Sequence, residues 1–126
     1  MVDKPVFKIT FPWKLMVVNH PYLGKECWLL NLDRITIGDN VCISQRAFLC
    51  MGNHDYTSRS LDLIVKPIHV EDGAWICANA FVGPGVAVGR NAVLTVGSIA
   101  TKDLEMFGIY WGNPEIFVKK RVVRAN

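Results

Sequence analysis

The residue in this sequence best suited to acid–base chemistry is His54, which stands in the short polar run Asn53-His54-Asp55-Tyr56. An imidazole titrates near neutral pH and can take a proton from a hydroxyl group, so His54 is a candidate general base. Asp55 or a backbone carbonyl could fix its tautomer. The alternative is that Asn-His-Asp simply makes a polar turn. Composition and spacing leave both interpretations open.

Other catalytic groups have less support. His20 precedes Pro21, and His69 stands at the entrance to an apolar stretch, so a structural role is expected for both. Ser58 and Ser60 lack the glycine elbow of a serine nucleophile, and no cysteine stands beside a histidine. The sequence therefore does not favour nucleophilic catalysis.

Metal binding and paired-carboxylate hydrolysis are also not expected. The cysteines show neither CxxC spacing nor histidines at zinc-site distances, so we expect reduced thiols and no metal. Only Asp62 and Glu71 are available as a carboxylate pair, and both are expected to be surface charges. The four cysteines are Cys27, Cys42, Cys50 and Cys77.

The overall composition is that of one globular domain spanning residues 1–126, with 51% hydrophobic and 20% charged residues. The net charge of +3 is too small and too dispersed to favour a nucleic-acid partner. The basic residues of the last eight positions, Lys119, Lys120, Arg121 and Arg124, indicate a solvated terminal face. We expect no targeting or transmembrane segment and a cytoplasmic location, because the longest apolar run near the start is short.

The elements that must position His54 are indicated by an apolar residue every six positions. One run contains Ile37, Ile43 and Leu49, and a second starts at Val70 and continues through Ile76, Val82, Val88, Leu94 and Ala100. A second column, four residues further on, is mostly small. Earlier in the chain, Val17, Leu23, Leu29 and Ile35 keep the same period, which then slips by two residues at Ile37.

Turn residues fall in phase with this period, directly after the apolar column. They form the triplets Gly38-Asp39-Asn40, Gly83-Pro84-Gly85 and Gly89-Arg90-Asn91, whose residue types tolerate tight turns and positive φ. Each hexad therefore predicts one short strand plus one corner, and three hexads close a triangular coil. Stacked coils bury the apolar column and pair every strand with those in neighbouring coils.

The fold that we predict is all-β: a parallel β-helix of roughly five coils over about residues 15–104. Leu49 and Val70 are separated by a number of residues that is not a multiple of six, so residues 55–69 are expected to protrude as a loop, closing near Lys66-Pro67. Residues 105–126 are expected to form a short C-terminal tail or helix.

The chain also resembles a known family, the hexapeptide-repeat sugar O-acetyltransferases, and within them the colanic acid biosynthesis acetyltransferases. The resemblance covers nearly the whole chain, and its specificity lies in the order and spacing of several stretches around the Asn-His-Asp-Tyr loop. These stretches are Ile37 to Gln45 (IGDNVCISQ), Ala47 to Tyr56 (AFLCMGNHDY), Ile64 to Trp75 (IVKPIHVEDGAW), Val82 to Val88 (VGPGVAV), Gly97 to Asp103 (GSIATKD) and Gly112-Asn113-Pro114.

The resemblance implies a left-handed coil, a homotrimer, and acetyl-CoA as co-substrate bound in the groove between subunits. It also implies that His54 is the base that takes a proton from a saccharide hydroxyl in a ternary complex. The acetylated saccharide would then serve polysaccharide biosynthesis. Asn53 could help to position the acceptor or an oxyanion, although a backbone amide could do so equally well. Because every step occurs in the ternary complex, no acyl-enzyme is needed.

The resemblance further implies which residues bind the cofactor. The pantetheine arm would run along Trp75 and Ala78 and then along Val96 and Gly97 in the next coil. The remaining positions are Thr101 and Lys102, near the nucleotide, and Lys119 and Arg121, at the phosphates. Structural roles are the alternative, with Trp75 packed outside the prism and Thr101-Lys102 as a plain turn.

Two departures from the family limit these implications. The family often has alanine and a basic residue after Gly-Asn-Pro, whereas this chain has Glu115-Ile116, so one phosphate contact is expected to be missing. Many relatives also carry a longer N-terminal segment that shapes the acceptor pocket, so the acceptor and the activity of so short a chain stay open. A trimeric scaffold without catalysis and an N-acyltransferase acting on an amino-sugar are the alternatives.

Overall fold

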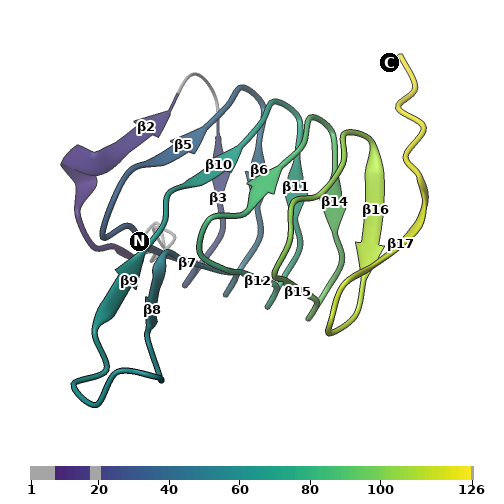
Figure 1. The fold of residues 1–126 in the computed structure, drawn as a ribbon. Coiled ribbons are helices and arrows are strands. Elements are labelled where there is room, and N and C mark those ends of the chain that lie inside the picture. The colour runs from purple at the N-terminus through teal and green to yellow at the C-terminus, as the bar shows by residue number, and fades with distance from the viewer. Residues whose placement is uncertain (1–7, 18–20, 126) are drawn as a thin grey trace.

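The computed structural model describes residues 8–17 and 21–125, and it is a three-sided prism of parallel strands (Figure 1). The chain turns a corner after each short strand and returns to the same face one coil later. We call the three faces A, B and C, and we name each corner by the faces that it joins. The all-β fold and the parallel coil are confirmed, while the left hand of the coil stays a prediction from the resemblance.

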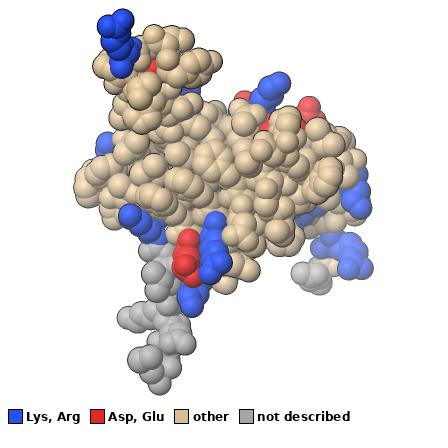
Figure 2. All heavy atoms as spheres, turned by 90° about the horizontal axis from the view of Figure 1, so that it is seen from below, with Lys and Arg blue, Asp and Glu red and all other residues tan. Residues whose placement is uncertain are grey.

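Face A is a parallel sheet whose outward side chains include three stacked or edge-on aromatic rings, Trp28, Phe48 and Phe81. Seen from below, this side of the molecule is mostly uncharged, with charged side chains of both signs mainly at its margins (Figure 2). Its strands are β1 (Lys8–Ile9), β4 (Trp28–Leu30), β7 (Phe48–Cys50), β12 (Phe81–Val82) and β15 (Ile99–Ala100).

Faces B and C complete the prism. A short 3₁₀ helix, η1 (Pro12–Lys14), leads into face B, which consists of β2 (Leu15–Val17), β5 (Ile35–Ile37), β10 (Ile68–Val70) and β13 (Ala87–Val88). Face C consists of β3 (Tyr22–Leu23), β6 (Cys42–Ile43), β11 (Trp75–Ile76), β14 (Val93–Leu94), β16 (Gly108–Trp111) and β17 (Ile116–Lys120). Among the described strands of the three faces, β17 alone is antiparallel to its neighbour.

The interior is the six-residue column that the sequence predicts. All nine of its members are at most 1% exposed, and the register stacks them one coil above another, so that Ile43, Ile76 and Leu94 are successive neighbours on face C. The second column is buried as well, except Asn53, which lies outside the prism. The slip of two residues is also confirmed, because Val17 pairs with Ile37.

The corners have the backbone geometry that the turn triplets predict. The third residue of each triplet has positive φ: 54° at Asn40, 76° at Gly85 and 56° at Asn91. The first residue has a different requirement, because a Cβ at Gly89 would lie 2.6 Å from the carbonyl oxygen of Leu104. Glycine is needed there because the next coil packs directly against the corner.

Two predicted boundaries are wrong. The protruding segment is a β-hairpin of β8 (Gly52–His54) and β9 (Leu63–Val65), which we call the arm. It begins before residue 55 because Gly52 already pairs with Val65, and it ends before residue 69 because Ile68 has rejoined face B. The arm extends away from the prism at the A–B corner (Figure 1).

The coils also continue past residue 104: residues 105–120 contain strands instead of a helix, and only residues 121–125 continue beyond β17 as a tail. Strand β16 stacks on β14, and Tyr110 extends the interior column above Leu94. Tyr110 is buried, and its hydroxyl accepts a hydrogen bond from the backbone N–H of Glu105. The sequence pattern missed this strand because Tyr110 follows Leu94 by 16 residues instead of 18. Strand β17 then folds back along β16 as a hairpin.

Candidate active site

The arm places His54 at the end of β8, outside the prism. In the antiparallel ladder of the arm, His54 stands opposite Leu63 and Asn53 stands opposite Ile64. The tip is closed by a hydrogen bond of 2.8 Å from the backbone N–H of Asp55 to the carbonyl oxygen of Asp62. The side chain of His54 is exposed, so an external molecule can reach it.

One hydrogen bond determines the tautomer of His54. Its Nδ1 lies 2.8 Å from the carbonyl oxygen of Leu61. A carbonyl oxygen only accepts, so Nδ1 carries the proton and Nε2 of the neutral ring has a free lone pair. The group that orients His54 is therefore a backbone carbonyl and not Asp55, the other group that the sequence left open. Leu61 itself has φ of 51°, the left-handed region that tight turns use.

Asp55, the other group that the sequence left open, organises the tip of the arm instead. Its Oδ1 accepts hydrogen bonds from the hydroxyl of Thr57 and from the backbone N–H of the same residue. These hydrogen bonds stabilise the ionised carboxylate and so lower the pKa of Asp55; the Thr57 hydroxyl has the larger effect and the Thr57 backbone N–H the smaller. The carboxylate thus supports the turn that carries Leu61 without contacting the imidazole.

Asn53 joins the arm to a groove at the A–B corner. Its side-chain oxygen accepts the backbone N–H of His54 at 2.8 Å, which leaves the amide nitrogen as a donor. The groove has a volume of about 380 Å³ and combines an apolar floor with a few polar groups, as ligand sites do. It is lined by Gly52, Asn53, Ile64, Lys66, Phe81, Gly83, Pro84 and Thr101.

Thr101 and Lys102 lie at the same corner, two coils away from β7. Their donors are already bound to a carboxylate: the backbone N–H of Lys102 lies 2.8 Å from Glu115 Oε1, and the Thr101 hydroxyl lies 3.2 Å from Oε2. The backbone N–H of Thr101 also donates to Oε1, at 3.1 Å. The structure therefore brings Asn53 and Thr101 into one groove and places an internal anion beside it.

The predicted pantetheine residues lie elsewhere, on face C and at the C–A corner. Trp75 is 42% exposed on β11, and its indole N–H donates to the Ser44 hydroxyl at 2.9 Å. Ala78 and Gly97 are neighbours in adjacent coils, since the N–H of Gly97 donates to the carbonyl oxygen of Ala78 at 3.0 Å. Val96 is 66% exposed beside them. In one chain these residues are separated from His54 and Thr101 by the width of face A.

The predicted phosphate-binding residues Lys119 and Arg121 lie in a third region, on β17 and directly after it. Lys119 is exposed on β17, opposite Ile109. Arg121 follows β17, and its Nη1 donates to the carbonyl oxygens of Gly73, at 3.0 Å, and Asn91, at 3.3 Å. These contacts tie the C-terminal segment to the B–C corner.

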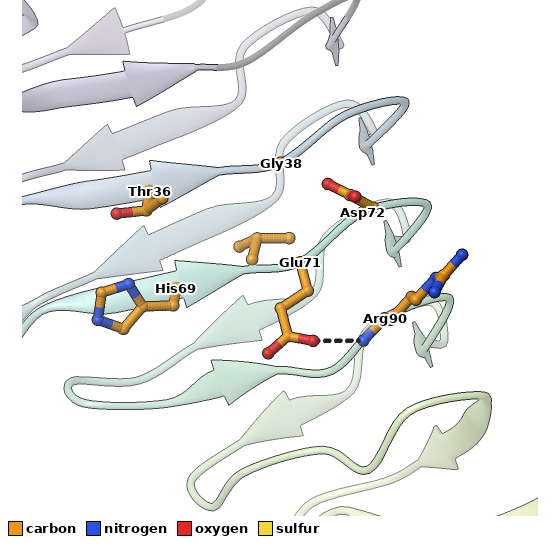
Figure 3. Close-up of a pocket in the computed structure, with 7 residues that line it drawn as sticks. Thr36, Gly38, His69, Glu71, Asp72 and Arg90 are labelled. Carbon is orange, nitrogen blue, oxygen red and sulfur yellow. Dashed lines mark hydrogen bonds between the residues drawn. The ribbon is translucent and has the colours of Figure 1, made fainter.

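A larger groove, of about 470 Å³, lies on face B and contains the second described histidine, His69 (Figure 3). Its acidic groups already satisfy backbone donors. Glu71 accepts the backbone N–H of Arg90, and Asp72 accepts that of Asp39. We assign the groove a structural role, as the sequence predicts for His69. The remaining histidine, His20, lies outside the described residues.

Two properties relevant to function concern the described residues as a whole. Within residues 8–17 and 21–125, no group of three His, Cys, Asp or Glu side chains is arranged to hold a metal ion. Over the same ranges, the structure contains no helix long and apolar enough to cross a membrane.

Sequence reasoning missed two members of this arrangement. A backbone carbonyl was one of the two groups left open for His54, but the identity of the residue gives no signal that it would be the carbonyl of Leu61. Glu115 did give a signal, because the resemblance leads one to expect alanine there, but its position on the Thr101 and Lys102 donors requires the three-dimensional turn.

Comparison with known proteins identifies curated relatives, although no family model matches the chain. A protein of Escherichia coli (strain K12) provisionally named as a colanic acid biosynthesis acetyltransferase is 35% identical over 122 residues, covering 97% of this chain and 67% of its own length. The galactoside O-acetyltransferase of the same strain is 34% identical over 106 residues, covering 82% of this chain and 52% of its own length.

A solved structure has the same fold. The hexapeptide-repeat-containing acetyltransferase of Vibrio cholerae O1 biovar eltor, complexed with acetyl coenzyme A, superimposes with a TM-score of 0.87 at 24% identity. The match covers 93% of this chain and 66% of that chain. This chain thus spans between about half and two thirds of the length of the three proteins.

Proposed function

Since the chain belongs to the hexapeptide-repeat acetyltransferases, we propose that it transfers the acetyl group of acetyl-CoA to a saccharide hydroxyl, with His54 as general base. The observation that carries the proposal is the hydrogen bond from His54 Nδ1 to the Leu61 carbonyl. In the neutral ring this bond leaves the lone pair on Nε2, and the ring lies on an exposed arm. A general base needs both properties.

In the proposed mechanism, Nε2 of His54 takes the proton of the acceptor hydroxyl while the hydroxyl oxygen attacks the thioester carbonyl. The C–S bond then breaks, and the imidazolium returns the proton to the departing thiolate. The Leu61 carbonyl accepts a hydrogen bond from Nδ1 in both protonation states of the ring, so it keeps the base in one orientation throughout. The acetyl group passes directly between the two substrates, and no acyl-enzyme forms.

Asn53 is proposed to position the reacting groups. Its side-chain oxygen is held by the His54 backbone N–H, so its amide NH₂ is the group that can turn toward the groove. A donor at this position can hold the acceptor or the oxyanion of the tetrahedral intermediate. The apolar lining beside it, from Ile64 and Phe81, suits the acyl end of the co-substrate better than its charged end.

Acetyl-CoA is proposed to bind between subunits of a homotrimer. The residues assigned to its pantetheine arm lie at the C–A corner, whereas His54, Thr101 and Lys102 lie at the A–B corner. Apposing the C–A corner of one subunit to the A–B corner of the next would unite the two sets. The outer side of face A supports such an interface, because it is rich in half-buried aromatic rings and mostly uncharged apart from Lys8, whose Nζ lies over the Trp28 ring.

The proposed contacts of the cofactor follow from this arrangement. Trp75, Ala78, Val96 and Gly97 would line the pantetheine arm, and Thr101 with Lys102 would meet the nucleotide end. Lys119 is exposed on its strand and would contact a phosphate. Arg121 adds positive charge nearby, but its Nη1 is engaged by two backbone carbonyls, so we expect a smaller contribution from it.

The acceptor is proposed to be a saccharide or a sugar conjugate used in the cytoplasmic stages of surface polysaccharide synthesis. The curated relatives with sugar or polysaccharide names support this class of acceptor. The exposed arm also suits a bulky, hydrophilic acceptor, because His54 is reached from open solvent.

The test is thiol release from acetyl-CoA with a panel of sugars and nucleotide sugars, measured for the native chain, His54→Ala and His69→Ala. A general base contributes roughly 10²- to 10⁴-fold in rate, so His54→Ala should lose activity on this scale while acetyl-CoA affinity changes little. His69→Ala is the matched control and should retain full activity. Equal rates for the native chain and His54→Ala would remove His54 from the mechanism, and no turnover with any acceptor would favour a non-catalytic scaffold.

The assembly is tested separately by light scattering coupled to size-exclusion chromatography. A homotrimer predicts a mass of about three times the 14.1 kDa of the chain. A monomeric mass would contradict the proposed site, because one chain keeps its two halves on different corners.

A further inference from the structure

Glu115 carries a negative charge into the part of the proposed site that should receive an anion. It lies in the turn between β16 and β17 and is half-buried. Its two carboxylate oxygens accept three hydrogen bonds, from the backbone N–H groups of Thr101 and Lys102 and from the Thr101 hydroxyl. Two successive N–H groups directed at one point, with a hydroxyl beside them, form an anion-binding nest.

The position of this nest explains why its donors are available. One coil earlier, the N–H of Gly83, which occupies the corresponding corner position, donates to the carbonyl oxygen of Ala100 in the next coil at 2.9 Å. Strand β15 is the last strand of face A, so Thr101 has no following coil on this face to receive its N–H. Thr101 and Lys102 are both exposed, and the carboxylate of Glu115 accepts the two N–H groups that no following coil takes up.

The turn does not depend on Glu115 alone. The backbone N–H of Ile99 donates to the carbonyl oxygen of Gly112 at 3.0 Å, and the N–H of Gly112 donates to the Ser98 hydroxyl at 2.9 Å. These two bonds hold the turn against the beginning of β15, on the C–A side of face A, whereas the nest lies where β15 ends. Replacing the Glu115 side chain should therefore empty the nest without releasing the turn.

We propose that Glu115 is an internal competitor for the phosphate groups of acetyl-CoA at the Thr101–Lys102 nest, and that it lowers the affinity of this chain for its co-substrate. This proposal rests on the proposed function. A phosphate oxygen would use the same three donors as the carboxylate, so the two anions exclude one another by occupancy and repel one another by charge. A co-substrate that must displace an internal ligand binds more weakly. Its apparent affinity is its intrinsic affinity multiplied by the fraction of molecules whose nest is open.

The test is the affinity of CoA, measured by titration calorimetry at low salt for the native chain, Glu115→Gln and Glu115→Ala. Removing the charge should tighten binding by about tenfold in both variants, and the gain should shrink at high salt. Comparing the two variants separates charge from occupancy, because the amide oxygen of Glu115→Gln can still accept from the corner N–H groups, whereas Glu115→Ala leaves them free. Pantetheine, which has no phosphate, should bind all three proteins equally.

Glu105→Gln is the matched control. Glu105 lies near the same end of the prism, and no hydrogen bond or salt bridge of its carboxylate is found among the described residues. The control removes the same charge without opening the nest, so its CoA affinity should stay close to that of the native chain. An equal gain in Glu105→Gln would overturn the proposal, because net charge alone would then explain the effect.

A second measurement tests the nest without CoA. Inorganic pyrophosphate is titrated while the amide signals of Thr101 and Lys102 are followed by NMR, and both signals should saturate at lower concentration in Glu115→Gln than in the native chain. Unchanged or weaker affinity of the variant for pyrophosphate, or for CoA, would overturn the role of Glu115. If none of the proteins bound CoA, the proposed function would fail, while the pyrophosphate titration would still decide whether Glu115 fills an anion site.

Discussion

The imidazole of His54 is held by the carbonyl oxygen of Leu61, seven residues further along the same arm, at 2.8 Å from Nδ1. Both residues belong to the β-hairpin that leaves the prism, and neither belongs to the repeating coil. The orientation of the proposed base therefore depends on the conformation of the hairpin tip. Residues that order the tip should influence catalysis without touching either substrate.

Asp55→Ala should lower kcat by about ten- to a hundredfold while KM for acetyl-CoA stays nearly constant. The change removes the acceptor for both the hydroxyl and the backbone N–H of Thr57, which loosens the tip that carries Leu61. Steady-state kinetics with the best acceptor checks this. Thr57→Ala, which keeps the backbone bond, should show a smaller loss, and a kcat for Asp55→Ala equal to that of the native chain would contradict the positioning role.

The carboxyl group of Asp55 should titrate below its ordinary pKa of 3.8, because the Thr57 hydroxyl and N–H stabilise the ionised form. A lowered pKa in the folded state means that the carboxylate stabilises the tip above the unfolded pKa, and that this stabilisation is lost as pH falls through the folded pKa. NMR titration of the Asp55 carboxyl and the Thr57 amide should give one shared midpoint. A midpoint at or above 3.8 would be inconsistent with these hydrogen bonds.

The four cysteines should divide into two pairs by reactivity. Desolvation by burial raises the pKa of both Cys27 and Cys77 to about 11, whereas Cys42 and Cys50 are half-exposed. The thiolate is the reactive form, so the two buried thiols should resist a disulfide reagent at mildly alkaline pH. Counting released chromophore before and after denaturation checks this, and rapid reaction of all four thiols in the folded protein would contradict the buried positions.

Ile76→Ala should destabilise the protein by roughly 2–5 kcal/mol, the usual cost of truncating a fully buried aliphatic side chain. Ile76 is 0% exposed and lies between Ile43 and Leu94 in the interior column. Urea unfolding at fixed protein concentration measures the loss, with Val122→Ala as control because Val122 is 85% exposed. Similar losses for the two variants would be incompatible with this core.

The interior of the prism could be predicted from sequence because a constant step repeats one local environment. The column through Ile43 and Ile76 follows from that step alone, and so does positive φ at Asn40 and Asn91. Prediction failed where the step changes. Tyr110 completes a shorter last turn, and the strands of the arm pair with each other instead of with a neighbouring coil.

The candidate site was less predictable, since it depends on contacts between segments that share no repeat. His54 stood out by its chemistry, and the resemblance gave it a role, but the tautomer depends on a backbone oxygen. The clustering of Thr101 with Glu115 depends on a turn 14 residues away. The left hand of the coil likewise rests on the resemblance, because periodicity is the same for both hands.

The arm is attached to the prism at a single place. Where it departs and returns, the N–H of Lys66 donates to the carbonyl oxygen of Met51 at 3.2 Å, and beyond that point its ladder is internal. A hairpin fastened in this way can change its length or composition without altering the layers on either side. Under the proposed function, acceptor preference could therefore change by remodelling one insertion, while the stacked coils and their folding stay as they are.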